Sequence, residues 1–253
     1  MRKMMIRFAG FLTALLLLTS SCDLLTQVAG TIDTGGGKLT TEQVVQGLKE
    51  ALKIGTEIAV KNLNQTDGYF LDNLVKIDLP PETQEILSYA RRVPGLDQLI
   101  SDVVLQINRS AEDAVVKAAP IFSGAITSMS ISDAWGILNG ADSAATNYLR
   151  ANTYNKLFDL YKPSIQASLE KPIVAGVSAS QTWSKITSRW NMFANSAAGR
   201  VLQVRTMDYS LEEYVTHQAL RGLFIKVQDQ EKKIRTDVSA RTTDLLRKVF
   251  GQG

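Results

Sequence analysis

The sequence contains one cysteine and one histidine among 253 residues, and these two scarcities exclude several kinds of chemistry. A single thiol, Cys22, cannot form a disulfide within the chain. A metal site rich in cysteine or histidine cannot be built, and we predict neither a metal nor another cofactor. A serine–histidine–carboxylate triad would have to use His217, and no serine lies in a Gly-x-Ser-x-Gly turn. Because Leu220 and Phe224 share its helical flank, we expect His217 at the edge of the core.

An excess of charge of one sign is also missing. Lysine and arginine number 28 and aspartate and glutamate 25, but Arg2, Lys3 and Arg7 lie in an N-terminal segment that we expect to be removed. Without these three, the chain has 25 basic and 25 acidic residues. Because binding to nucleic acid needs a basic surface, this balance argues against a nucleic-acid partner.

Residues 1–21 have the order of a secretory signal peptide. Positive charges come first, an apolar run follows from Phe8 to Leu18, and small residues precede Cys22. The run has about 11 residues, whereas a membrane-spanning helix needs roughly 20. Cys22 resembles the lipid-modified cysteine of a bacterial lipobox, with Thr19 where a branched apolar residue is usual. We therefore predict a lipoprotein that is attached to a membrane through acylated Cys22.

Residues 22–39 are predicted to be the lipidated cysteine and a flexible tether, because they include three consecutive glycines at 35–37. The predicted location is the cell envelope, facing the periplasm. Asp23 resembles an inner-membrane retention signal of enteric bacteria, a rule that depends on the organism. The inner and the outer membrane therefore both stay open.

Helical patterns dominate from residue 40 onward. Apolar residues recur at spacings of three and four, and no alternating strand pattern of convincing length is present. The sequence predicts an all-α protein with a single multi-helix, bundle-like domain over residues 40–253, in which the helix over 211–235 is central and largely buried. The expected helices cover residues 40–63, 82–92, 96–118, 132–138, 142–163, 178–193, 211–235 and 240–250.

The ends of these helices follow from caps and breakers. Residues 65–81 and 195–208 are expected to be irregular, Pro120 to break or bend a helix, and Pro163 to end one. Four side chains are expected to cap helix N-termini: Thr40, Ser132, Asp142 and Ser210.

Two groups of polar residues lie beside apolar helical stripes. If their helices pack together, the two groups could line a polar pocket. An ion pair within one helix, between Arg109 and Glu112, and a helix cap at Asp142 explain the same residues without a pocket. The candidate pocket residues are Asn108, Arg109, Glu112, Asp142, Tyr148 and Arg150.

An aromatic stripe is formed by Trp183, Trp190 and Phe193, which recur at helical spacing. Such a stripe is typical of core packing, and it would also suit a surface that faces a membrane or a protein partner.

Five stretches are informative when they are taken together and in order: residues 47–56, 75–80, 107–112, 137–146 and 241–250. They resemble the bacterial domain-of-unknown-function family numbered 4197, and the resemblance covers about residues 44–251. It implies a helical envelope protein that often has a lipoprotein signal, and it implies no activity, cofactor or catalytic residue.

Three functions fit these observations. The first is a non-enzymatic binding or scaffold module of the cell envelope, with an envelope protein as partner, and it is favoured because thiol, metal and histidine chemistry are lacking. The second is binding of a lipid or small amphiphile inside the bundle, suggested by the apolar helix over 211–235. The third is hydrolysis of envelope material by a pair of carboxylates, which would require two acidic groups facing each other across a cleft.

Overall fold

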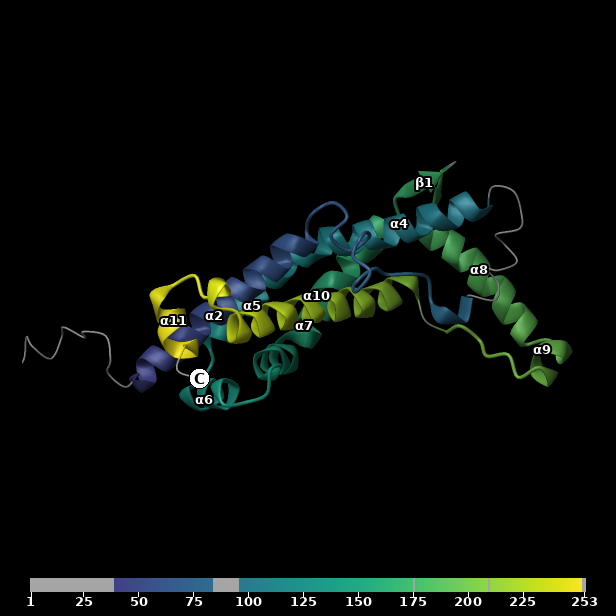
Figure 1. The fold of residues 1–253 in the computed structure, drawn as a ribbon. Coiled ribbons are helices and arrows are strands. Elements are labelled where there is room, and N and C mark those ends of the chain that lie inside the picture. Colours follow the sequence, from purple (N-terminus) through teal and green to yellow (C-terminus); the bar gives the residue numbers. More distant parts are fainter. Residues whose placement is uncertain (1–38, 84–95, 175, 209, 252–253) are drawn as a thin grey trace, which may run out of the picture. The chain divides into compact units, whose positions relative to one another are not determined.

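The computed structural model describes residues 39–83, 96–174, 176–208 and 210–251 (Figure 1). The chain divides into residues 1–40 and residues 41–253, and the architecture below is that of the second part. Its regular elements are helices apart from one short hairpin, which confirms the predicted all-α class. Most of the helix expected over 82–92 lies outside the described residues, and Pro81–Thr83 form the 3₁₀ turn η1.

Four long rods make up the centre of the fold (Figure 1). Each presents an apolar face because its leucine, valine, isoleucine and alanine residues recur every three or four positions. The rods are α2 (Thr41–Leu63), α4 (Leu96–Ala114) continued through the 3₁₀ turn η2 (Val115–Lys117) into α5 (Ala118–Thr127), α7 (Ala144–Leu169) and α10 (Leu211–Thr236).

Hydrogen bonds between rods show that α7 runs antiparallel to α4–α5. Along these bonds the residue number rises on one rod as it falls on the other. The bonds join Gln106 to the Ser168 carbonyl, Tyr161 to the Val115 carbonyl, and Tyr148 to the Ala125 carbonyl.

Contacts of α10 give its direction in the same way. The beginning of α10 lies beside the later part of α7, where Lys162 Nζ and Glu213 Oε2 are 3.5 Å apart. Its end lies beside the start of α7, where the Ala145 amide donates to the Glu231 carboxylate. Gly55 of α2 faces Gln230 of α10. The four rods therefore alternate in direction, as in an up-and-down helix bundle.

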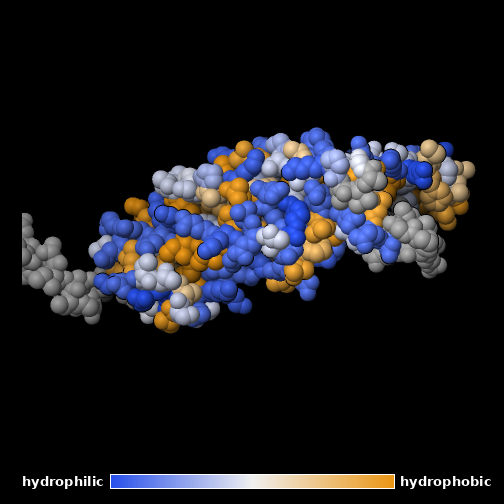
Figure 2. Space-filling view, turned by 90° about the horizontal axis from the view of Figure 1, so that it is seen from above, coloured by the Kyte–Doolittle hydropathy of each residue, from blue (hydrophilic) through white to orange (hydrophobic). Residues whose placement is uncertain are grey.

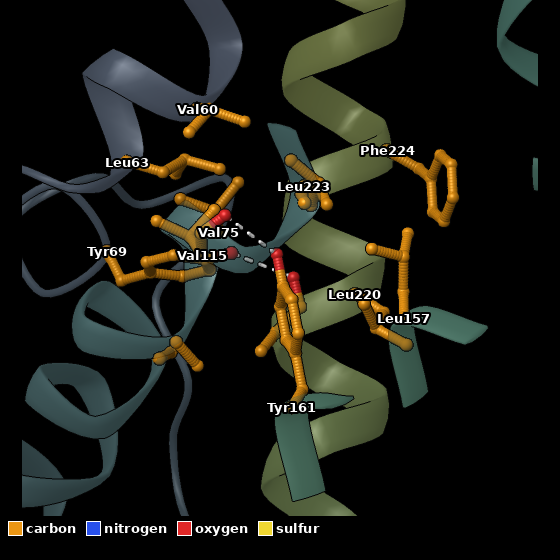
Figure 3. Packing of buried hydrophobic residues seen from close by; sticks show 14 of the residues in the cluster. Val60, Leu63, Tyr69, Val75, Val115, Leu157, Tyr161, Leu220, Leu223 and Phe224 are labelled. Atoms are coloured by element: carbon orange, nitrogen blue, oxygen red, sulfur yellow. Dashed lines mark hydrogen bonds between the residues drawn. The ribbon is translucent and has the colours of Figure 1, made fainter. Parts of the chain in front are cut away.

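The core between the rods is continuous and contains large aromatic side chains (Figure 3). Phe122 and Phe224 meet edge to face with ring centroids 6.0 Å apart. The fully buried Tyr69 and Tyr161 place their hydroxyls on the backbone carbonyls of Ala219 and Val115, so that no polar atom of these two rings is left unpaired in the core.

Smaller elements cover the two ends of the bundle. Near the start of α2, α6 (Ile131–Leu138) and α11 (Asp244–Phe250) pack on it, and the 3₁₀ turn η3 (Val238–Ala240) joins α10 to α11. At the other end, strands β1 (Pro172–Val174) and β2 (Val177–Ser178) form an antiparallel hairpin. This hairpin leads into α8 (Ala179–Ala194), which is followed by α9 (Ala197–Val201).

Two predicted breaks lie elsewhere than expected. The interruption near Pro120 falls at η2, before the proline, which occupies the first turn of α5 where its missing N–H does least harm. The expected end at Pro163 is wrong, because α7 continues to Leu169. Pro163 is exposed, so water can hydrate the carbonyl that it leaves without a partner, while buried Tyr161 and Ile165 on either side hold the helix on the core.

Two predicted caps are also wrong. Ser130, and not Ser132, caps α6, because only Ser130 has Asp133 three residues later to complete a reciprocal capping box. Ser210 precedes α10 without a capping hydrogen bond from its side chain. The segment expected to be irregular over 195–208 contains the short helix α9, capped by Ser196.

Among the described residues, no single helix is long and apolar enough to span a membrane. One pair bent by 106°, residues 97–127 with Ile131–Leu138, meets the length and composition criteria, which buried core helices also meet.

The contact of α10 with the segment after α2 predicts an effect of Gly222. A Cβ atom at this position would come within 2.8 Å of the Tyr69 ring and 3.1 Å of Val75. We expect Gly222→Ala to lower the free energy of unfolding by about 1–3 kcal/mol, measured by urea denaturation. The control is Gly124→Ala in α5, where an added Cβ atom would have no atom within 4 Å. Alanine reduces the backbone freedom of the unfolded chain, so this substitution should raise the free energy of unfolding by roughly 0.5–1 kcal/mol. Equal effects of the two substitutions would contradict this packing.

Candidate functional site

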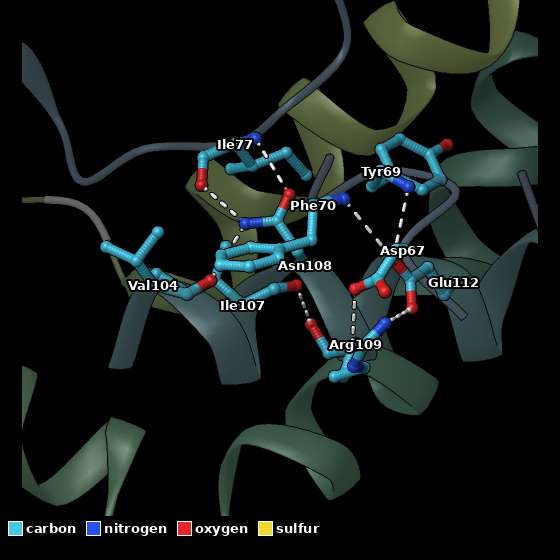
Figure 4. A network of polar contacts seen from close by, with 10 residues as sticks. Asp67, Tyr69, Phe70, Ile77, Val104, Ile107, Asn108, Arg109 and Glu112 are labelled. Atoms are coloured by element: carbon cyan, nitrogen blue, oxygen red, sulfur yellow. Dashed lines mark hydrogen bonds and ion pairs between the residues drawn. The ribbon is translucent and has the colours of Figure 1, made fainter. Parts of the chain in front are cut away.

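Three of the predicted site residues lie together on α4 and bind the segment that follows α2 (Figure 4). Glu112 accepts hydrogen bonds from the backbone amides of Tyr69 and Phe70 at 3.1 and 3.3 Å. Arg109 lies 2.6 Å from Glu112 and 2.6 Å from Asp67, so that it joins both carboxylates. The intrahelical ion pair expected between Arg109 and Glu112 is therefore present, and it is extended to a second segment of the chain.

Asn108 makes a second connection between α4 and this segment (Figure 4). Its side-chain oxygen accepts from the Ile77 amide at 2.9 Å, and its side-chain nitrogen donates to the Ile77 and Val104 carbonyls at 2.8 Å. The side chain is fully buried, and its amide offers an acceptor oxygen and a donor nitrogen side by side, so it pairs with both backbone groups of Ile77. Asn108 thus replaces the strand partner that the extended backbone at Ile77 would otherwise need.

Two further contacts tie the same segment to α10. The Tyr69 hydroxyl donates to the Ala219 carbonyl at 2.8 Å, and burial, with the nearby Glu112 charge, raises the pKa of Tyr69 well above its usual range. Asp72 lies 2.5 Å from Lys226. Burial alone would raise the pKa of Asp72, but hydrogen bonds from Lys226 and the Leu74 amide, with the Lys226 charge, lower it below its usual value.

The polar contacts of this cluster, here named the clamp, are structural and fasten one segment of the chain to two helices. Every buried side-chain nitrogen and oxygen of the described residues has a hydrogen-bond partner, and both Glu112 oxygens are occupied by amides and by Arg109. With both oxygens bound by groups of the protein itself, the Glu112 carboxylate is not directed at a substrate. The arrangement holds residues 67–77 across α4 and α10.

The other three predicted residues lie elsewhere. The Tyr148 hydroxyl donates to the Ala125 carbonyl, Arg150 stacks 5.0 Å from the centre of the Phe224 ring, and Asp142 is exposed before α7. The antiparallel register explains the separation. Tyr148 is opposite residue 125, which is 16 positions, or roughly 24 Å, along the rod from Arg109. None of the described contacts joins the two groups, although their helices do pack together.

The cap expected from Asp142 is wrong, because another residue occupies that place. Glu231 of α10 accepts hydrogen bonds from the amides of Ala145 and Thr146 and from the Thr146 hydroxyl, at 2.7–3.0 Å. Its neighbour one turn on, Arg235, pairs with it at 3.0 Å and donates to the Ile137 and Leu138 carbonyls at the end of α6. The acid thus meets a helix N-terminus and the base a helix C-terminus, as the helix dipole favours.

Sequence reasoning missed Glu231, although a signal was available. Val227 and Ile234 lie four residues before it and three after it, which places a carboxylate on the apolar face of the helix. A buried acid in such a position must find donors, and the nearest unpaired donors in a helical protein are helix N-termini.

His217 is more exposed than predicted. It lies on the outer flank of α10, where its Nδ1 is 2.7 Å from the Tyr154 hydroxyl and its ring lies 4.8 Å from Phe158. The aromatic stripe of α8 is divided: Trp183 is buried, Trp190 is half-buried and donates to the Arg205 carbonyl, and Phe193 is exposed. Cys22 lies outside the described residues.

An open groove lies between α8 and the start of α10. It has a volume of about 250 Å³, and its lining combines four hydroxyl-bearing residues with one carboxylate and two apolar side chains. The lining residues are Ser180, Trp183, Ser184, Thr187, Ser210, Leu211 and Glu212.

The fold and the site together define a class: an antiparallel helix bundle whose buried polar groups serve to fasten its parts. The family model described as "Protein of unknown function (DUF4197)" matches residues 38–251, and the chain belongs to this family. No curated protein and no solved structure matches the chain.

The Asn108 contacts predict a large loss of stability for Asn108→Ala. The substitution leaves the Ile77 amide and carbonyl buried without partners, and we expect it to lower the free energy of unfolding by about 2–4 kcal/mol. Hydrogen exchange of the Ile77 amide should be faster in the variant than in the wild type, and the increase should be larger than for amides in α7. The control is Asn152→Ala, because Asn152 is exposed and bonds only within its own helix. Unchanged protection at Ile77 would contradict the clamp.

The Asp72–Lys226 pair predicts a dependence of stability on pH. Because the pKa of Asp72 is lower in the folded than in the unfolded chain, its contribution is present above the ordinary aspartate pKa and disappears as pH falls through the folded value. We expect Asp72→Asn to cost about 0.5–1 kcal/mol near neutral pH and almost nothing once the pH is below the folded-state pKa of Asp72. Urea denaturation at several pH values measures this, with the exposed Asp113→Asn as control. A cost that does not change with pH would exclude an ionic contribution.

Proposed function

We propose that this protein is a cell-envelope lipoprotein whose helical unit is a non-enzymatic binding or scaffold module. The observation that carries the proposal is Cys22, which follows a charged, an apolar and a small-residue segment in the order of a lipoprotein signal. Acyl chains on Cys22 would hold the module at a membrane, since two or more chains anchor a protein firmly. Residues 23–39 would serve as the tether.

The surface of the helical unit supports binding. The hydroxyl-lined groove between α8 and α10 is open to solvent, and large apolar side chains are exposed nearby at the end of α8 and in α9. Exposed apolar groups that gather in one place are typical of surfaces that bind a protein or a membrane.

The interior of the bundle supports a binding or scaffold module better than it supports a protein that binds a lipid inside the bundle. The apolar cavity between α2, α10 and α11 has a volume of about 20 Å³, which is room for about one water molecule. An acyl chain would have to separate the rods of the bundle. The apolar surface of α10 is used in packing against α7 and α2.

The buried acidic residues also support a binding or scaffold module better than they support a hydrolase. Glu112 and Glu231 are buried on different helices, and each is paired with an arginine and with backbone amides. A pair of catalytic carboxylates would have to face each other across a cleft, whereas the oxygens of these two are bound by groups of the protein itself.

Acylation of Cys22 is tested by Cys22→Ala in a bacterial host. We expect the wild-type chain to partition into detergent and to yield an N-terminal peptide that begins at Cys22 and carries acyl groups. The Cys22→Ala chain should lose the acyl groups and the detergent partition. Ser21→Ala, which keeps a small residue before the cysteine, is the matched control and should be processed normally. A Cys22→Ala chain processed and partitioned like the wild type would refute the proposal.

A further inference from the structure

The turn from α8 into α9 exposes an unusual number of large apolar side chains. Met192 is 75% exposed, Phe193 41%, Val201 83% and Leu202 67%. All four lie within residues 192–202, here named the α8–α9 tip. Figure 2 shows apolar surface at this end of the helical unit, next to hydrophilic surface.

The α8–α9 tip is a fixed turn. A Cβ atom on Gly199 would lie 2.2 Å from the Phe193 carbonyl, so only glycine allows α9 to fold back this closely on the end of α8. The returning chain is bound to α8 by Trp190, which donates to the Arg205 carbonyl at 2.8 Å, and by Asn191, which bonds the Met207 amide and carbonyl. The apolar side chains are therefore presented outward by a defined structure.

Charge along residues 171–207, the stretch that contains the tip, is of one sign. No aspartate or glutamate lies between Glu170 and Asp208, although acidic and basic residues are otherwise nearly balanced along the chain. The exposed charged residues of this stretch are all basic: Lys171, Lys185, Arg189, Arg200 and Arg205. Exposed apolar groups within a stretch whose charges are all basic, with a half-buried tryptophan beside them, have the composition of surfaces that bind at the interface of an anionic bilayer.

We propose that the α8–α9 tip binds the surface of a bilayer containing anionic phospholipid. Met192, Phe193, Val201 and Leu202 enter the boundary between headgroups and acyl chains, and Arg189, Arg200 and Arg205 bind lipid phosphates. This contact goes beyond the acyl anchor, because it uses residues at the end of the bundle away from Thr41. A second contact with the bilayer orients the helical unit on it, which a single attachment point cannot do.

A second copy of the chain fits the tip less well. Two tips face to face would bring together the same basic residues, and residues 192–202 contain no acid of their own to pair them. Like charges in contact oppose association. Phosphate groups supply the missing negative charge and acyl chains the apolar phase. A bilayer therefore satisfies both properties of the tip at once.

The test measures whether Trp190 meets lipid. The full chain carrying Trp135→Phe, so that only Trp183 and Trp190 fluoresce, is reconstituted with vesicles whose acyl chains are brominated. The vesicles are phosphatidylcholine with or without phosphatidylglycerol. We expect the fluorescence of the half-buried Trp190 to be quenched by vesicles that contain phosphatidylglycerol. Most of this quenching should be lost with vesicles of phosphatidylcholine alone. Trp183 is buried, so contact with lipid should change mainly the fluorescence of Trp190. This signal comes from the end of α8 and does not depend on what holds the N-terminus to the vesicle.

Two sets of variants separate the apolar from the basic contribution. Met192→Ser with Leu202→Ser, and Arg189→Gln with Arg200→Gln and Arg205→Gln, should each abolish the quenching while circular dichroism stays unchanged. Matched controls are Ile131→Ser, an exposed apolar residue on α6, and Lys53→Gln with Lys61→Gln, exposed on α2, which should quench like the wild type. Absence of quenching with phosphatidylglycerol would overturn the proposal, as expected if a protein partner or a second copy covers the tip. Equal quenching in the tip variants or in pure phosphatidylcholine would overturn it as well.

Discussion

The fold depends on the two opposite charges that α10 places between the end of α6 and the start of α7. Glu231 accepts from the first amides of α7, and Arg235 donates to the last carbonyls of α6. Both side chains are largely buried, so each would be costly without the other and without the helix ends that they meet. Together they terminate one helix, begin the next, and set where α7 starts along α10. That starting point determines which residues of the antiparallel rods face one another.

The register set in this way explains why the polar residues of α4 and of early α7 form no common pocket. Tyr148 and Arg150 lie where α7 meets α5 and α10, whereas Arg109 and Glu112 lie where the segment after α2 crosses α4. The place where the segment after α2 crosses α4 would otherwise be unstable, because residues 67–77 form no helix that could pair all of their backbone groups. Glu112 and Asn108 of α4 bind backbone groups of this segment, and its own turns bind others. Lys226 of α10 pairs with the Asp72 carboxylate, so that an irregular segment is held against the core from two helices.

With the buried polar groups engaged in holding the fold, the features suited to interaction are on the surface at one end of the bundle. The groove and the α8–α9 tip both belong to the part that follows α7, and α8 makes fewer contacts with the rods than the rods make with one another. A rigid bundle that ends in an apolar and basic turn can hold a fixed position at a bilayer, and its groove then has a fixed height above that surface.

The sequence by itself determined the helices, since the spacing of apolar residues is a local property: α2, α8 and α10 begin and end within a residue or two of the expected positions. It also determined the class and the family, and the ion pair of Arg109 with Glu112, because residues three apart on a helix are neighbours whatever surrounds them. Only the tertiary structure decided the continuation of α7 through Pro163, the cap of α7 by Glu231, the contacts of Asn108 with Ile77, and the separation of the predicted pocket residues. In each of these cases the deciding partner lies more than 30 residues away or is the core as a whole, and no local pattern specifies which distant groups a helix will meet.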